Sequence, residues 1–260
     1  GGKLGDLFAF KQDHIFKDWD DVKANANNRY DAIGELYGPA AWEALKDKAG
    51  KQPIEPGDVC WADLNNDGVI NNLDRVKVGN LFPTVTGGFS TTLGYKDFSL
   101  YARFDYALGH TLYNDLAARS LGQYQGSFNI IDMVKDSWSE TNQDTDIPKF
   151  YYADQLSKKN ITRSNNGLTA VDNNSSRFYE KGDYLALREI TLTWNLPKKW
   201  INKALMSNAS VYVTGQNLFY ITGYTGVSPE PAVDTTYGQG LDNGRYPTPK
   251  TVLLGLSVTF

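Results

Sequence analysis

Apolar and polar residues alternate along the last stretch of the chain, residues 248–260. A period of two over about 10 residues is what a strand needs when one face meets lipid and the other a polar lumen. The last strand of a soluble β-sandwich also alternates, so this segment alone leaves both architectures open. The polar parity has one exception, Leu253, and the apolar parity holds Val252, Leu254, Leu256, Val258 and the terminal Phe260.

The same alternation predicts five further strands, two of them joined into a hairpin by a two-residue turn at residues 96–97. On the polar face of the second hairpin strand, Arg103 and Asp105 need water or internal partners. In a later strand Glu189 is polar-facing, whereas Arg188 interrupts the apolar face, where we expect it to snorkel. The six predicted strands lie near residues 7–16, 84–95, 98–108, 182–196, 209–221 and 248–260.

The connections between these strands differ strongly in length. The long ones are residues 17–83, 109–177 and 223–247, and the short ones are residues 96–97 and 196–208. Counting back from the chain end places all three long connections on one side and both short ones on the other. Long extracellular loops opposite short periplasmic turns are typical of an outer-membrane barrel, and a soluble sandwich gives no reason for this asymmetry.

Six strands are too few to close a membrane barrel, which needs about eight. An open edge in lipid would leave backbone groups unpaired. We therefore interpret residues 1–260 as the C-terminal portion of one all-β barrel domain whose other strands come from an upstream segment. The first residues lack the apolar core of a signal peptide, and no window approaches the roughly 18 apolar residues of a membrane helix.

Composition narrows the possible functions. A net charge of −4 without a basic cluster argues against a nucleic-acid partner. The single cysteine, Cys60, excludes an internal disulfide and is expected to be a small, semi-buried side chain. His14 and His110 lie beside apolar residues without metal-ligand spacing, so we expect structural roles. No nucleophile elbow or phosphate-cradling glycine loop occurs, and the sequence predicts that the protein is not an enzyme.

Residues 63–74 match the template of a calcium loop. The template has oxygen donors at positions 1, 3 and 5, glycine at 6, a backbone carbonyl at 7 and a carboxylate at 12. An aspartate stands at position 12, so its arm is shorter than that of the usual glutamate. A turn cluster without metal is the alternative. We expect a structural Ca²⁺ held by the side chains of Asp63, Asn65, Asp67 and Asp74 and the carbonyl of Val69.

Polar side chains on the predicted wall strands are candidates for contact with a ligand in the lumen. Ordinary packing is the alternative role for each of them. The candidates are Tyr101, Arg103, Asp105 and Glu189.

Short motifs that are weak singly and specific together run from Gly57 onward: GDVCWADLNNDG (57–68), RVKVGN (75–80), GGFSTTLGY (87–95), FSLYARF (98–104), GDYLALREITL (182–192), GQNL (215–218), GYTGVSPE (223–230) and GRYP (244–247). With them the chain resembles the SusC-type (SusC/RagA family) TonB-dependent outer-membrane transporters of Bacteroidetes. Two positions, Cys60 and Ser228, depart from the expected pattern of a polar or charged residue and an aspartate.

The resemblance implies a barrel of about 22 strands with an N-terminal plug, in the cell outer membrane and surrounded by its lipid. It also implies active import of oligosaccharides, or of peptides, driven by the TonB complex through the plug. A SusD-like surface lipoprotein would close over the extracellular loops. The plug and the TonB box are N-terminal features that these residues do not include.

Two other functions remain open from the sequence. One is a secreted glycan-binding β-sandwich with a dockerin-like calcium loop, although a second calcium repeat is missing and a loop of nearly 70 residues would be unusual. The other is a barrel enzyme, which would need a nucleophile beside a histidine such as His110. No serine is convincingly placed there.

Overall fold

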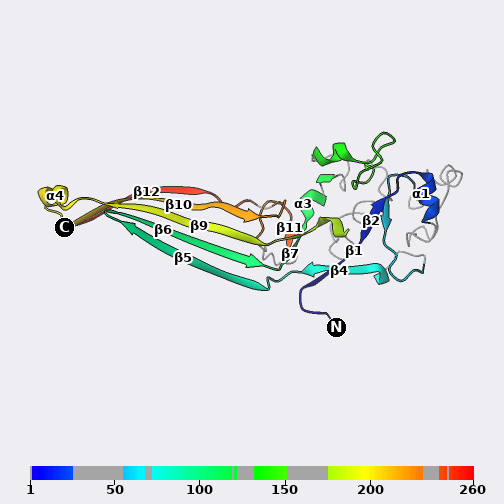
Figure 1. Cartoon of the computed structure of the whole chain (residues 1–260), viewed down its shortest axis with the longest axis horizontal. Coiled ribbons are helices and arrows are strands. Elements are labelled where there is room, and N and C mark those ends of the chain that lie inside the picture. Colours follow the sequence, from blue (N-terminus) through cyan, green and yellow to red (C-terminus); the bar gives the residue numbers. More distant parts are fainter. Residues whose placement is uncertain are drawn as a thin grey trace.

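The computed structural model describes residues 2–25, 55–67, 72–118, 120–121, 132–150, 175–230, 240–244 and 246–260. Its largest unit is a five-stranded sheet in the order β12-β10-β9-β6-β5, with every neighbouring pair antiparallel (Figure 1). The predicted all-β class is confirmed. The strands are β5 (Val85–Tyr95), β6 (Phe98–Leu108), β9 (Tyr184–Asn195), β10 (Asn208–Thr222) and β12 (Thr251–Thr259).

One face of this sheet is apolar from edge to edge. Cross-strand partners form aligned rows, and in one row the Phe98 and Trp194 rings stack with centroids 6.0 Å apart. Within the described part of the chain no second sheet covers this face, and many of its large side chains are exposed. Such a surface is what a barrel wall presents to lipid. The adjacent row consists of Leu93, Leu100, Leu192, Val213 and Leu254.

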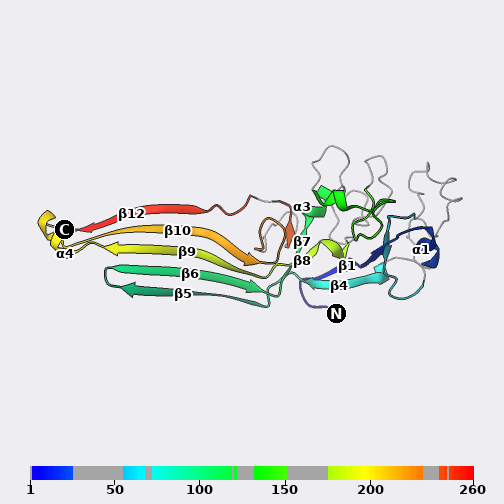
Figure 2. The ribbon, with the colours of Figure 1, turned by 45° about the horizontal axis from the view of Figure 1, so that its top comes forward.

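The two ends of the sheet differ. At one end lie the hairpin turn and the short connection that carries α4 (Lys198–Ile201) and η7 (Asn202–Ala204). At the other end the remaining small elements gather, as the two views agree (Figures 1 and 2). Lys96 takes the left-handed conformation that the tight turn needs, with φ of 52°.

The segment predicted as a first wall strand, residues 7–16, does not join the five-stranded sheet. It forms two short strands with separate partners: β1 (Asp6–Phe10) pairs with β4 (Arg75–Asn80), and β2 (Gln12–Ile15) pairs with β3 (Val59–Trp61). Alternation was the only basis for the prediction, and a strand in any sheet alternates. The described wall therefore has five strands of this chain, one fewer than expected.

Residues from distant parts of the chain build the small elements at the loop end. One apolar cluster joins β1, β2, α1 (Trp19–Ala24) and β3 to Trp138, and a second joins β7 (Thr111–Asn114), α3 (Asp115–Ala118) and η6 (Ser176–Phe178). A three-stranded sheet links β11 (Leu241–Asp242), β7 and β8 (Tyr179–Lys181), while η1 (Asn72–Asp74) and η3 (Asp132–Asp136) complete the region.

The described parts of the long connections thus form packed structure at this end of the wall. None of the helices in the described residues is both long and apolar enough to cross a membrane.

Candidate functional site

The face of the sheet opposite the apolar one carries rows of polar side chains. Arg103 and Glu189 are cross-strand partners in one row, which continues at the register positions of Ser90, Gln216 and Thr251. A second row contains Tyr101, Thr191, Thr214 and the exception Leu253, and the Thr191 and Thr214 hydroxyls lie 2.8 Å apart. Three of the four candidate ligand-contacting residues therefore share this face in adjacent rows.

Two irregularities occur at one level of the sheet and change which face the next residues take. Pairing of β6 with β9 shifts between Arg103 and Phe104, which leaves Arg188 as the extra residue of β9. Pairing of β10 with β9 shifts at the same level, where Asn217 has a φ of 53°. A bulge re-aims side chains because two residues on one strand oppose one on its neighbour.

The bulge turns Arg188 toward the polar face, which corrects the prediction that it snorkels on the apolar one. Its Nε donates to Asp105 Oδ2 at 2.9 Å, and Nη2 lies 2.6 Å from Glu230 Oε1. The Arg188 side chain is only 15% exposed, and such a guanidinium requires partners of opposite charge. Asp105, the fourth candidate ligand-contacting residue, is thus engaged in an ion pair.

Tyr220 completes this cluster of four side chains, here called the Arg188 cluster (Asp105, Arg188, Tyr220 and Glu230). Its hydroxyl donates to Glu230 Oε1 at 2.6 Å and accepts from Arg188 Nη1 at 3.2 Å. Asp105, Arg188 and Tyr220 come from β6, β9 and β10, whereas Glu230 follows the last of these strands in a loop. The cluster therefore ties three adjacent wall strands to the segment that leaves β10.

A second set of contacts holds the same loop. Asp242 is 7% exposed, and its Oδ2 accepts the Tyr224 hydroxyl at 2.8 Å and the amide of Val227 at 2.9 Å. Burial and the hydrogen bond to the Asp242 carboxylate raise the pKa of the Tyr224 hydroxyl. The loop after β10 is consequently anchored at residues 224 and 227 as well as at residue 230.

The predicted calcium loop connects β3 to β4, and it is described except for residues 68–71, so the Val69 carbonyl lies outside the described residues. Asp74 is fully buried, and its Oδ1 accepts the amide of Leu64 at 2.9 Å, which closes the loop end to end. Asn65 Oδ1 accepts the amide of Asp67. The carboxylate at position 12 thus lies against the start of the loop, as the calcium template requires, and the donor set fits a hard cation.

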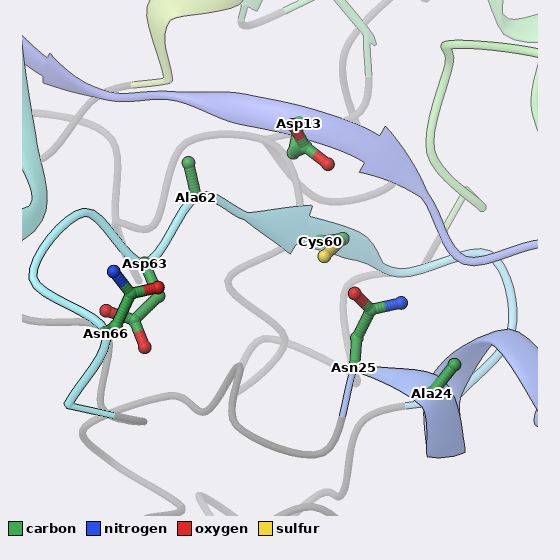
Figure 3. Close-up of a pocket in the computed structure, with 7 residues that line it drawn as sticks. All are labelled: Asp13, Ala24, Asn25, Cys60, Ala62, Asp63 and Asn66. Carbon is green, nitrogen blue, oxygen red and sulfur yellow. The ribbon is translucent and has the colours of Figure 1, made fainter.

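A pocket of about 330 Å³ adjoins this loop (Figure 3). Asp63 and Asn66 from the loop, Cys60 from β3, Asp13 from β2 and Asn25 after α1 line it. Its lining is mostly polar although it lies beside the first apolar cluster. Sequence analysis missed this grouping, because β2 and β3 are far apart in the chain and their pairing is not visible in local periodicity.

The two histidines have different surroundings. His110 is 1% exposed, and its Nε2 lies 2.9 Å from the carbonyl of Pro229, in keeping with the structural role expected for it. His14 is partly exposed, with a carboxylate at each ring nitrogen: Asp13 at 2.8 Å from Nδ1 and Asp21 at 3.2 Å from Nε2.

A sheet with one apolar and one polar face, bearing long connections at one end only, has the features of the wall of an outer-membrane β-barrel. Solved structures of known proteins share this fold. The RagAB peptide transporter structure matches with a TM-score of 0.60 at 24% identity, covering 78% of this chain and 21% of that chain. A structure of the RagAB peptide importer in the "open-open" state matches with a TM-score of 0.58 at 23% identity, and the match covers 78% of this chain and 21% of that chain. These likenesses support the fold.

Sequence relatives identify the family, although no protein-family model matches the chain. TonB-dependent receptors P3 and P26 of Formosa agariphila are 31% and 32% identical over 88% and 81% of this chain. TonB-dependent receptor SusC of Bacteroides thetaiotaomicron is 25% identical over 100% of it. The chain belongs to the SusC-type TonB-dependent receptors. It spans 22%, 20% and 22% of the lengths of these three relatives.

Proposed function

We propose that this chain supplies barrel wall and loops to an outer-membrane transporter that imports oligosaccharides, or peptides, in a TonB-dependent way. The observation that carries this proposal is the two-faced sheet, with its apolar rows on one side and its polar rows on the other. The names of the sequence relatives support TonB dependence. RagAB is a peptide transporter, and growth experiments can decide the substrate class for this chain.

The polar rows give the wall a ligand-facing role. Tyr101, Arg103 and Glu189 present hydroxyl, guanidinium and carboxylate groups on one surface, which can hydrogen-bond sugar hydroxyls or peptide amides. Within the described residues no ion pair involves Arg103, whereas Asp105 is held by Arg188. We therefore assign ligand contact to the first three residues and a positioning role to Asp105.

The loops at the end of the wall opposite the hairpin turn would receive the ligand from a SusD-like lipoprotein lid. The Arg188 cluster gives a physical route by which that loop end is joined to the wall, because Glu230 is in the loop and its three partners are in strands. Upstream barrel strands and the plug, which contacts the TonB complex, would come from other parts of the transporter.

Calcium has a structural part in this proposal. The carboxylates of Asp63, Asp67 and Asp74 and the Asn65 amide oxygen would hold Ca²⁺ between β3 and β4. The ion would order a loop whose ends already meet through Asp74 and Leu64. No reaction is assigned to it, and the relatives are named as receptors and transporters rather than enzymes.

The secreted sandwich is less well supported. A sandwich needs a second sheet over the apolar face. In the described residues the other sheets have two or three strands and lie at the end of the wall rather than over this face (Figures 1 and 2).

Growth tests the proposal. A strain that lacks the full-length transporter gene should lose growth on one class of polymer, either oligosaccharides or peptides, and keep growth on monosaccharides and free amino acids. Loss of TonB function should reproduce the defect. Restoring the gene with Arg103→Ala and Glu189→Ala together should restore surface expression with slower uptake. Unchanged growth of the deletion strain on every polymer would refute the import role.

A further inference from the structure

His14 and Cys60 are direct partners in the β2–β3 pair. Opposite residues of an antiparallel pair project from the same face, with Cβ atoms about 4.5–5.5 Å apart. A thiol and an imidazole are therefore placed side by side by backbone pairing. The His14 ring is also packed edge-on against Phe16, with ring centroids 5.6 Å apart, which fixes its orientation.

Asp13 would ordinarily point to the opposite face, because neighbours along a strand alternate. The register of β2 against β3 shifts between Gln12 and His14, so Asp13 is the extra residue of a bulge. A bulge re-aims a side chain in this way. Asp13 and Cys60 accordingly line the same pocket (Figure 3), and one ligand atom from each of Asp13, His14 and Cys60 lies within 4.8 Å of the others.

We propose that Asp13, His14 and Cys60 form a binding site for a thiophilic divalent cation of the Zn²⁺ class, separate from the calcium loop. Thiolate, imidazole and carboxylate form a donor set for borderline metals, whereas Ca²⁺ takes oxygen ligands. Ligand atoms around a tetrahedral zinc are about 3.3–3.8 Å apart, from bond lengths near 2.0–2.3 Å. The ligand atoms of the three groups lie within 4.8 Å of one another, so the widest separation would shorten by no more than about 1.5 Å to reach that geometry. Asp13 Oδ2, which lies 2.8 Å from His14 Nδ1, would move outward by about 0.5 Å.

The surroundings of His14 complete the arrangement. Asp21 Oδ1 lies 3.2 Å from Nε2 and can accept a hydrogen bond from Nε2–H, which leaves Nδ1, beside Asp13, to bind the metal. A ligating histidine almost always donates its other ring N–H to a carboxylate, a backbone carbonyl or water. Asp18 caps α1 through the amides of Asp20 and Asp21, so the helix start fixes the position of Asp21.

The pocket supplies room for a fourth ligand. Its volume of about 330 Å³ exceeds that of a water molecule, about 30 Å³ in the liquid, so a metal at its wall would keep an open position. Cys60 is 2% exposed and His14 and Asp13 are more open, so the cation would enter from the pocket. Its expected effect is to cross-link β2 to β3 directly before the calcium loop.

Cobalt binding to the full-length transporter in detergent, with Ca²⁺ saturating throughout, tests the site. A thiolate ligand gives Co²⁺ a charge-transfer absorption in the near ultraviolet. We expect this band in the wild type, its loss on adding Zn²⁺, and its absence in Cys60→Ser and His14→Gln. Asp13→Asn should weaken Co²⁺ binding by about tenfold or more. The matched control Asp144→Asn, an exposed carboxylate elsewhere on the loops, should bind as the wild type does.

A second measurement needs no variant. Zn²⁺ should slow maleimide modification of the peptide that contains Cys60, read by mass spectrometry, and Ca²⁺ alone should not. Identical Co²⁺ spectra for wild type and Cys60→Ser, or a band that survives in His14→Gln, would overturn the proposal. Equal labelling of Cys60 with and without Zn²⁺ would overturn it as well.

Discussion

Arg188 Nε lies 2.9 Å from Asp105 Oδ2 across two adjacent strands, although strict alternation would place these residues on opposite faces of the sheet. The bulge at Arg188 makes the contact possible by reversing the parity of β9 relative to β6 at that level. The same guanidinium reaches Glu230 in the following loop. One bulged residue thus connects β9 to the loop that follows β10.

Replacing Arg188 should release this loop. Arg188→Ala leaves the Asp105 and Glu230 carboxylates without their shared cation, at a cost of about 1–3 kcal/mol. We expect faster protease cleavage near residues 223–230 and a lower melting temperature of the transporter in detergent. Arg188→Lys keeps the charge but loses the forked geometry, so its effect should be intermediate. Arg103→Ala, an exposed arginine on the same face, is the control, and equal cleavage rates for all variants would contradict the role given to Arg188.

A close contact at Gly182 predicts a second outcome. A Cβ on Gly182 would clash with His110 Nε2, and that ring is buried and hydrogen-bonded to the Pro229 carbonyl. Gly182→Ala should therefore destabilise the β7–β8 pairing by about 1–3 kcal/mol. The readout is faster hydrogen exchange in the peptide that covers Thr111–Asn114.

Gly223 provides the matched control, since a Cβ there would meet nothing within 4 Å. Gly223→Ala should exchange as the wild type does. A double variant with His110→Ala should suffer less from the added methyl than Gly182→Ala alone does. If hydrogen exchange of the Thr111–Asn114 peptide is no faster in Gly182→Ala than in Gly223→Ala, then Gly182 is not closely packed against His110.

All five strands of the wall could be predicted from the sequence, because each of them shows local periodicity. Alternation placed Tyr101, Arg103 and Glu189 on the polar face, and the residues at 96–97 identified the hairpin. Alternation placed Arg188 on the wrong face. The position of a bulge depends on the registers between neighbouring strands, and local periodicity does not show these.

Long-range pairing explains the other misses. Residues 7–16 alternate like a wall strand, yet they pair with β4 and β3, and nothing in the segment itself identifies those partners. The Asp13, His14 and Cys60 grouping depends on the same pairing. Nothing local in the sequence indicates the contact of Glu230 with Arg188, because that contact needs the loop to fold back on the wall.

The β1–β4 pair should open at low pH. Hydrogen bonds from Lys77 and Asn80 lower the pKa of Asp6 to about 2 from its ordinary value of 3.8. Because the folded-state pKa lies below the unfolded one, the stabilisation is complete above about pH 4 and is lost as the pH falls toward 2. Hydrogen exchange of residues 6–10, corrected for its intrinsic pH dependence, should accelerate across that window.

The variant Lys77→Met tests whether Lys77 causes the lowered pKa of Asp6. Without the ammonium group the Asp6 pKa should rise toward its ordinary value, and acceleration of exchange should begin at a higher pH. Identical pH profiles for the wild type and Lys77→Met would show that Lys77 is not the cause of the shift.

Calcium removal should loosen the connection between β3 and β4. A bound ion at 100 times its dissociation constant stabilises the folded loop by about 2.7 kcal/mol. Chelation with EGTA should therefore speed protease cleavage within residues 62–75. Asp67→Asn should show the faster rate even with Ca²⁺ present, whereas the exposed Asp132→Asn should retain protection by Ca²⁺. Equal cleavage rates of the wild-type loop with and without Ca²⁺ would contradict the calcium assignment.

If this chain is wall and loop of an outer-membrane transporter, its native particle must be a membrane complex, and the composition and mass of that particle can be measured. The particle should be extracted from membranes with mild detergent and characterised by light scattering and mass spectrometry. We expect the chain to require detergent and to be found with the rest of a TonB-dependent receptor and a SusD-like lipoprotein. A folded, monomeric particle of 29.0 kDa that is soluble without detergent would contradict it.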